Sequence, residues 1–191
     1  ASPISVKVPV VLEVIYVSMS GDDNNDGSRD APVATLKHAI EIAERGKIVI
    51  MNGDYTITET LIIDKDLDIT SMGTVTINGN QLGIMENSAN LNLTNIVFTN
   101  AKLATGSVIQ DKGNTTINGC TFYSCVTTGT SSAGPVNNLK GTMVINNSKF
   151  YQNKGARGVV ASQQGTKLII NNSEFYDNDC TSITNCYGII Y

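Results

Sequence analysis

The sequence has little of several residue types on which enzyme and metal sites often depend. It contains no tryptophan, one histidine and four cysteines, and only 16% of its residues are charged. No Cys-x-x-Cys or His-rich motif predicts a zinc site, and we expect the one histidine, His38, on a solvated helix face. A net charge of -4 without clustered Lys or Arg argues against nucleic acid or an anionic membrane as partner. No apolar run reaches the roughly 18 residues of a transmembrane helix, so we expect no membrane insertion.

What the sequence has instead is an internal repeat. The segment Thr142–Asn153 returns at 166–178 with one extra residue near its start, and weaker copies begin at Asn114 and Asn90. Within these copies a phenylalanine recurs every 24 to 28 positions, at Phe98, Phe122, Phe150 and Phe175. Self-similarity at this period is typical of a solenoid, in which each unit buries its apolar face against its neighbours.

Each repeat contains three short segments with the alternation of β-strands. Apolar residues, with Thr115 as the exception, stand five and seven positions before each Phe, as Ile145 and Met143 do before Phe150, which predicts a strand with one inward face. An Asn or Gly turn follows, as at Asn146-Asn147, and then a second strand carries the inward Phe. A third strand is expected to begin at a recurring glycine: Gly83, Gly106, Gly134, Gly158 and Gly188.

Three strands per repeat, each followed by a corner, predict an all-β fold, a right-handed parallel β-helix of about five to six rungs. Leucine-rich repeats have a similar length, but their Leu-x-x-Leu-x-Leu frame is absent here. A β-sandwich would not repeat an Asn turn and a Phe in fixed register. The parallel β-helix is therefore the architecture we expect.

Residues 1–46 differ from the repeats that follow. They contain a first strand ending at Tyr16–Ser18, a polar loop at Gly21–Ser28, and an amphipathic helix between Thr35 and Gly46. Thr35 is a suitable N-cap and Gly46 a suitable end of that helix. We expect the helix to cover the open N-terminal end of the core.

The predicted rungs occupy residues 47–191. Leu67 precedes Leu91 by 24 positions, so the irregular early turns are already in phase with the later repeats. The last residues, Gly188–Tyr191, begin a new rung and then stop. We therefore expect further rungs or a partner chain at the C-terminal edge.

The four cysteines fall into two pairs. Cys120 and Cys125 flank Phe122, and five extended residues span roughly 16 Å, too far for a disulfide. Cys180 and Cys186 bracket a longer loop that a disulfide is able to close, although free thiols are the interpretation we favour. Cys120 belongs to an inward column of small or apolar residues two positions before each Phe: Ile96, Cys120, Ser148 and Ser173.

Two sets of motifs carry a resemblance to known families. Five stretches resemble the N-terminal opening of pectin-lyase-like right-handed parallel β-helix proteins. They are Tyr16-Val-Ser18, Gly27-Ser28, Ala31–Ile40, Ile48-Val-Ile50 and Gly53-Asp-Tyr55. The Phe-x-x-Asn motifs at 150–153 and 175–178, each followed by Gly-x-[Val/Ile], are similar to repeats of chlamydial polymorphic outer-membrane proteins. With the Asn-Asn-Ser turns, residues 16–191 most resemble adhesin-like surface proteins of methanogenic archaea. The resemblance implies the fold and an extracellular or cell-surface location.

The same superfamily includes polysaccharide lyases, hydrolases and epimerases, so an enzyme is the alternative function. Lyase chemistry needs acidic calcium ligands on one sheet with an Arg or Lys beside them, and polygalacturonase-type hydrolysis needs a Gly-His-Gly that this sequence lacks. Asp64, Asp66 and Asp68 are expected to alternate along one strand, so Asp66 and Asp68 on its outer face would suit inverting hydrolysis. Lys65 and Leu67 are expected to point the other way. We interpret the aspartates as solubilising charges and expect no enzyme activity.

A calcium site is suggested by half of a known motif. Asp22, Asn24 and Asp26, followed by Gly27, match the first half of a calcium-binding loop. The position of the closing Glu is occupied by Val33. A polar loop of this composition also forms without an ion, so we expect no cofactor, with calcium as the alternative.

One residue after each inward Phe the side chain is expected to point outward, at Thr99, Tyr123, Tyr151 and Tyr176. Three tyrosines would then stack on one exterior face, about 4.8 Å apart. Such a ladder either binds a glycan or a cell-surface protein, or only stabilises the coil. From these observations we expect a non-catalytic adhesin-like or stalk module with a rigid β-helix.

Overall fold

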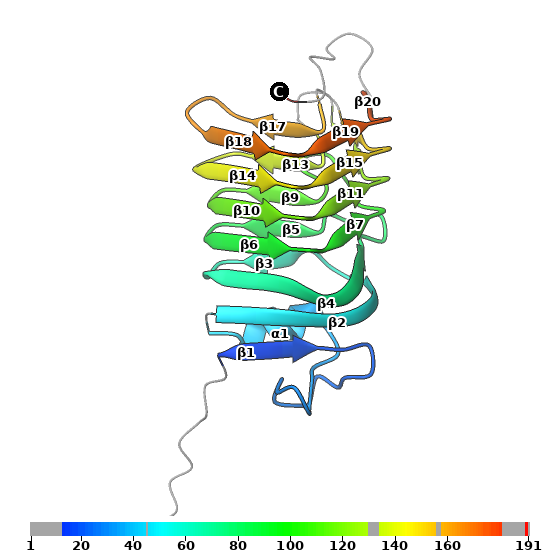
Figure 1. Ribbon diagram of the computed structural model, residues 1–191, viewed down its shortest axis with the longest axis vertical. Coiled ribbons are helices and arrows are strands. Elements are labelled where there is room, and N and C mark those ends of the chain that lie inside the picture. The colour runs from blue at the N-terminus through cyan, green and yellow to red at the C-terminus, as the bar shows by residue number, and fades with distance from the viewer. Residues whose placement is uncertain (1–12, 45, 130–133, 156–157, 181–189, 191) are drawn as a thin grey trace, which may run out of the picture.

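The computed structural model describes residues 13–44, 46–129, 134–155, 158–180 and 190. Across them the chain forms a parallel β-helix, whose strands each pair in parallel with the strand of a neighbouring turn (Figure 1). Two irregular turns begin the coil, and four regular rungs follow, which confirms the expected five to six rungs. The irregular turns contain β1 (Val14–Val17), α1 (Leu36–Ile42), β2 (Gly46–Thr56), β3 (Leu61–Ile63) and β4 (Leu67–Asn78).

Each regular rung contains four short strands, one more than the expected three, and they are counted from the strand that follows the recurring glycine. The first strands are β5 (Met85–Asn87), β9 (Ile109–Asp111), β13 (Val136–Asn138) and β17 (Val160–Ser162). The second are β6 (Asn90–Thr94), β10 (Asn114–Asn118), β14 (Thr142–Asn146) and β18 (Lys167–Asn171). The third are β7 (Val97–Thr99), β11 (Thr121–Tyr123), β15 (Lys149–Tyr151) and β19 (Glu174–Tyr176). The fourth strands, which are too short to show an alternation in the sequence, are β8 (Lys102–Leu103), β12 (Val126–Thr127), β16 (Lys154–Gly155) and β20 (Asp179–Cys180).

The turn between second and third strands has the left-handed conformation that the sequence predicts. The residue at this corner has a positive φ in every regular rung: Asn95 (56°), Gly119 (61°), Asn147 (51°) and Asn172 (46°). The earlier turns differ, because β4 runs through the corner as one strand of 12 residues. Leu67–Ile69 and Val75–Ile77, which alternate like two short strands, therefore belong to one strand. Similarly, the Asn-Gly-Asp sequence at 52–54 is typical of a turn but forms an irregularity within β2, where the register shifts between Met51 and Gly53.

Phenylalanines fill the interior as predicted. Phe98, Phe122 and Phe150 are completely buried, and Phe175 packs half-buried on the last described rung. Their ring centroids lie 5.1, 4.5 and 4.7 Å apart in order along the column. The rings continue the column of Ile77, which pairs in register with Phe98. Stacked aromatic and aliphatic side chains thus form one continuous core.

The asparagine of the Phe-x-x-Asn motif also points inward. Asn153 is completely buried, and its Nδ2 donates a 2.8 Å hydrogen bond to the carbonyl oxygen of Phe122, one rung earlier. Its Oδ1 accepts a 3.1 Å hydrogen bond from the backbone N–H of Cys125. Asn178 repeats the first contact with the carbonyl oxygen of Phe150. The motif therefore pairs backbone groups that the corner leaves outside the sheet ladders.

The helix α1 lies at the N-terminal end of the stack, beside β1 and against β3, as Figure 1 shows. It buries the apolar residues that its pattern predicts, Leu36, Ala39 and Ile40, and Thr35 caps it by accepting from the N–H of His38. The helix ends at Ile42 with Ala43 as C-cap, so the expected end at Gly46 is wrong. Gly46 instead begins β2, where it has a φ of 113°.

At the other end, burial decreases on the last described rung. Leu168 and Ile170 of β18 are half-buried, whereas Met143 and Ile145 one rung earlier are completely buried. Ile190 forms a parallel bridge with Val160, as expected for a further rung, while Gly188 and Tyr191 lie outside the described residues. The predicted partner or extra rungs at this edge stay a prediction.

Candidate functional site

The three candidate tyrosines form an outward ladder. Tyr123, Tyr151 and Tyr176 pair in register on β11, β15 and β19. Their ring centroids lie 5.3 and 5.2 Å apart, with interplanar angles of 5° and 4°. Tyr123 and Tyr151 are half-buried, and Tyr176 is 43% exposed. Thr99 precedes them in the same column but is buried, so the accessible ladder begins at Tyr123.

The ladder limits how a ligand can contact it. Both faces of the Tyr151 ring are covered by neighbouring rings, so Tyr151 offers its edge and hydroxyl group rather than a face. Partial burial and the two neighbouring tyrosines raise the pKa of Tyr151, so its hydroxyl stays a neutral donor and acceptor. Beside the ladder, Lys149 and Glu174 form an exposed ion pair at 3.4 Å. The face is therefore polar at its surface and aromatic beneath.

The three candidate calcium ligands lie in an exposed loop whose carboxylates have local partners. Asp22 Oδ1 accepts hydrogen bonds from the backbone N–H and the side-chain amide of Asn24, at 2.9 and 2.8 Å. Asp26 Oδ1 accepts from the N–H of Ser28, which lowers the pKa of Asp26. Among the described residues, no group of three or more His, Cys, Asp or Glu side chains is arranged for a metal. The calcium prediction stays untested.

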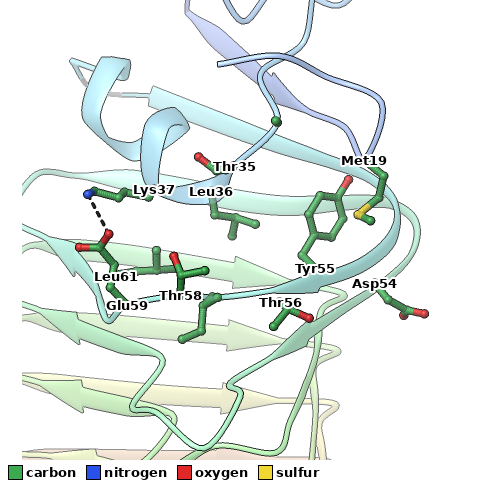
Figure 2. Close-up of a pocket in the computed structure, with 12 residues that line it drawn as sticks. Met19, Thr35, Leu36, Lys37, Asp54, Tyr55, Thr56, Thr58, Glu59 and Leu61 are labelled. Carbon is green, nitrogen blue, oxygen red and sulfur yellow. Dashed lines mark hydrogen bonds and ion pairs between the residues drawn. The ribbon is translucent and has the colours of Figure 1, made fainter. Parts of the chain in front are cut away.

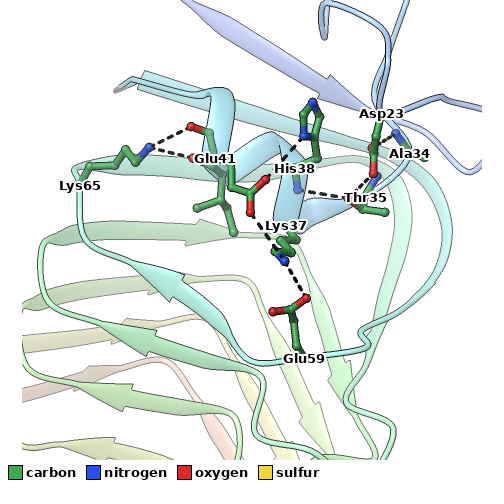
Figure 3. A network of polar contacts seen from close by, with 9 residues as sticks. Asp23, Ala34, Thr35, Lys37, His38, Glu41, Glu59 and Lys65 are labelled. Carbon is green, nitrogen blue, oxygen red and sulfur yellow. Dashed lines mark hydrogen bonds and ion pairs between the residues drawn. The ribbon is translucent and has the colours of Figure 1, made fainter.

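This loop has a structural role that explains its composition. Tyr16 of β1 donates to the carbonyl oxygen of Gly27 and accepts from the N–H of Val33, so the loop pairs with the outer edge of the first strand. Asp23, which the sequence analysis does not single out, accepts from the hydroxyl of Thr35 at 2.8 Å and from two backbone N–H groups (Figure 3). The loop thus covers a sheet edge and fixes the start of α1.

The alternative catalytic carboxylates border a shallow groove. Asp66 is exposed and lies just before β4, and Asp68 is half-buried on β4, so the three aspartates do not share one strand as expected. Both line a groove of about 680 Å³ together with Glu13 and Lys47. Lys47 pairs in register with Asp68, a neighbour that sequence spacing does not reveal. Asp66 accepts from the backbone and side chain of Asn90, which lowers the pKa of Asp66.

The residues expected to point away from this groove do so. Leu67 is buried in the core. The ammonium group of Lys65 donates to the carbonyl oxygens of Ile40 and Ala43, at 2.9 and 2.7 Å, at the C-terminal end of α1. Figure 3 shows Lys65 reaching the turn of α1 that carries Glu41. Lys65 therefore stabilises the free carbonyl end of the helix and takes no part in the groove.

A second hollow of about 350 Å³ lies between the N-terminus of α1 and the segment from Asp54 to Leu61 (Figure 2). Leu36 and Tyr55 form part of its apolar floor, and the Tyr55 hydroxyl donates to the carbonyl oxygen of Met51 at 2.8 Å. The Lys37–Glu59 ion pair, at 2.8 Å, closes one side. The Tyr55 hydroxyl and the charges of Lys37 and Glu59 are thus already paired. His38 lies half-buried on the same helix, 3.6 Å from a carboxylate oxygen of Glu41 (Figure 3).

Two of the cysteines are free as expected, and a third is not. Cys120 and Cys125 are free and buried, and burial raises the pKa of each thiol to about 12, which leaves them unreactive. Cys180 is disulfide-bonded. Cys186, the predicted partner, lies outside the described residues.

Comparison with known proteins supports the same architecture. The family described as "Right handed beta helix region" matches residues 32–191. No curated protein and no solved structure matches the chain. No helix among the described residues has the length and apolar character needed to cross a bilayer.

Proposed function

The chain belongs to the right-handed β-helix family, and from this premise we propose that it is a non-catalytic, adhesin-like or stalk module of the cell surface. The observation that carries the proposal is the outward tyrosine ladder on β11, β15 and β19. The rungs that carry the ladder share one hydrophobic core, which holds the tyrosine rings at a fixed spacing. Amphipathic side chains with little freedom to lose are suited to contact a glycan or a protein.

The contact would use hydroxyl groups and ring edges. Because neighbouring rings cover the faces of Tyr151, a sugar ring has no free face to stack on in the middle of the ladder. The remaining mode of binding is hydrogen bonding to the tyrosine hydroxyl groups, which recur at the spacing of the rungs. The proposal therefore favours partners with repeated polar groups.

An oxidising location is part of the proposal, and Cys180 supports it. A disulfide in a domain of this size is typical of secreted and surface proteins, because cytosolic thiols are kept reduced. The buried thiols of Cys120 and Cys125 are compatible with the same environment, since neither is accessible to an oxidant. Adhesin-like character and surface location together define the proposed role.

The test is binding of the intact domain to glycan arrays and to cells, with Tyr151→Ala, Tyr151→Phe and Val144→Ala compared. Val144 lies half-buried on the outer side of β14 and serves as a matched control. We expect Tyr151→Ala to weaken binding at least tenfold and Val144→Ala to leave it unchanged. Weak binding by Tyr151→Phe would identify the hydroxyl as the contact. Equal binding by all four proteins would remove the ladder from the proposal.

The groove at Asp66 and Asp68 favours a second candidate, a polysaccharide-active enzyme. Lys47 beside Asp68 supplies the basic side chain that lyase chemistry needs, and Asp66 lines the same groove. Incubation with acidic and neutral polysaccharides tests it by the appearance of reducing ends or unsaturated products. Product formation that Asp68→Asn abolishes would establish the enzyme and overturn the non-catalytic role.

A further inference from the structure

A buried polar column runs through the sheet of first strands. Asn87, Asp111, Asn138 and Ser162 pair in register on β5, β9, β13 and β17. Asn87 is 1% exposed, and Asp111 and Asn138 are not exposed at all. A carboxylate at such a position needs a partner, because burying an unpaired charge has a large cost in free energy.

One link of this column lacks the hydrogen bond that the others have. Asn87 Nδ2 donates to Asp111 Oδ1 at 2.9 Å, and Asn138 Nδ2 donates to Ser162 Oγ at 3.2 Å. Between them, Asp111 Oδ2 and Asn138 Oδ1 are both buried without a hydrogen-bond partner. A carboxylate oxygen and an amide oxygen both only accept, so the two atoms cannot pair as they stand.

Reversing the Asn138 amide does not solve the mismatch. Its Nδ2 also donates to the backbone carbonyl oxygen of Lys167 at 3.1 Å, and a carbonyl accepts only from a donor. Asp111 Oδ1 is likewise fixed, since it accepts from Asn87 and from the N–H of Gly113 at 3.0 Å. Because Asp111 and Asn138 are register partners on adjacent strands, one hydrogen shared by Asp111 Oδ2 and Asn138 Oδ1 would give both oxygens a partner.

We propose that the carboxyl group of Asp111 is protonated in the folded protein and donates from Oδ2 to Asn138 Oδ1, locking two rungs together in a pH-dependent manner. One proton then satisfies both unpaired oxygens and removes the buried charge. The neighbouring links of the column are direct hydrogen bonds, which favours a direct contact here over a bridging water.

The surroundings of Asp111 favour the neutral form. The groups that face it from β5, β10 and β13 are Asn87, Thr115 and Asn138, and none of them is charged or titrates. Lys112 follows Asp111 in the chain and the N–H of Lys140 donates to the Asp111 carbonyl oxygen, and both lysines are exposed. Burial raises the pKa of Asp111 above its ordinary 3.8, and hydrogen bonds from its neighbours offset this only in part.

The direction of the pH effect follows from the raised pKa. Below the ordinary Asp value both folded and unfolded chains carry the proton, so the contribution to stability is complete. As the pH rises toward and through the folded-state pKa, the unfolded chain releases its proton more readily, and the contribution is lost. The hydrogen bond from Asp111 to Asn138 therefore stabilises the fold at acidic pH, and its contribution to stability decreases as the pH rises. This regulation is independent of the proposed surface function.

The experiment measures the melting temperature of the wild type and of Asp111→Asn from about pH 4 to about pH 8. Asparagine keeps the shape and supplies an N–H donor to Asn138 at every pH. We expect the wild type to lose roughly 2 °C or more relative to Asp111→Asn as the pH rises. The exposed Asp64→Asn is the matched control and should follow the wild type. Parallel curves for the wild type and Asp111→Asn would overturn the proposal.

A direct measurement covers the case in which Asp111→Asn does not fold. The carbon-13 shift of the Asp111 carboxyl group in the wild type distinguishes an acid from a carboxylate. We expect the shift of a protonated acid at pH values just above 3.8, where an ordinary aspartate is already mostly ionised. A carboxylate shift there, as a bridging water or a bound cation would produce, overturns the proposal.

Discussion

The interior phenylalanine column and the exterior tyrosine ladder lie on the same strands, one residue apart. Phe150 and Tyr151 stack at nearly the same spacing, with centroids 4.7 and 5.2 Å from their partners on β19. They differ in burial, because Phe150 is completely buried and Tyr151 is half-buried. Equal stacking geometry therefore has unequal consequences: inside it forms the core, and outside it leaves polar edges available to a partner.

Asparagines repeat this contrast. Asn146 belongs to an exterior ladder, in which its Nδ2 donates to Asn118 Oδ1 at 2.9 Å and its Oδ1 accepts from Asn171 Nδ2 at the same distance. Asn153 belongs to the interior and pairs with backbone groups of the preceding rung. Water can replace the lost partner of an exterior amide. An interior amide has no such substitute, so its removal leaves buried groups unpaired.

The largest expected effect is that of Phe150→Ala. Truncation of a buried Phe removes contacts on both neighbouring rings and leaves a cavity, which costs about 3–5 kcal/mol of unfolding free energy. This is a large share of the roughly 5–15 kcal/mol that stabilises most domains. Urea unfolding measures the loss. Phe150→Leu, which retains more of the volume, is the control and should lose less.

A smaller loss is expected for Asn153→Ala. The buried N–H of Cys125 and the carbonyl oxygen of Phe122 lose their partner, at a cost of about 2–3 kcal/mol. Asn146→Ala, in the exterior ladder, should cost about 1 kcal/mol in the same unfolding experiment. If both variants lost the same stability, burial would not be what distinguishes the two columns.

The smallest effect on stability is expected for Tyr151→Ala. The variant loses two stacking contacts, but its ring is half-buried and water fills the space, so we expect a cost of about 1 kcal/mol. Thermal unfolding beside Phe150→Ala gives the comparison directly. Similar melting temperatures for these two variants would mean that the inward and outward positions had been assigned the wrong way round.

Much of the regular part of the fold could be predicted because each rung repeats a local pattern. The spacing of Phe98, Phe122 and Phe150 fixes their common column, and the Asn or Gly before each third strand fixes the left-handed corner. The irregular turns were harder to predict, since β4 crosses its corner without a break. Two-residue strands such as β8 depend on pairing with neighbouring rungs, and so short a segment shows no periodicity.

The candidate sites divide in the same way. The tyrosine ladder was predictable, because the residue after an inward Phe must point outward. The position of Lys47 beside Asp68 was not predictable, because it depends on the register of β2 against β4, two irregular strands. The role of Asp23 was also missed, since a helix start 12 residues away in the chain supplies its partners.

By itself the sequence determined the parallel coil, its inward phenylalanines and its outward tyrosines. Alternation along a strand sets which side chains point inward, and the repeat of 24 to 28 residues brings equivalent residues to the same position on each rung. Only the tertiary structure decided which polar residues are buried. Asp111 follows Ile109 and Gln110 like any aspartate near the end of a strand, and its burial arises from Asn87 and Asn138 on the neighbouring rungs. Contacts between rungs are set by register, and register is a property of the stacked chain as a whole.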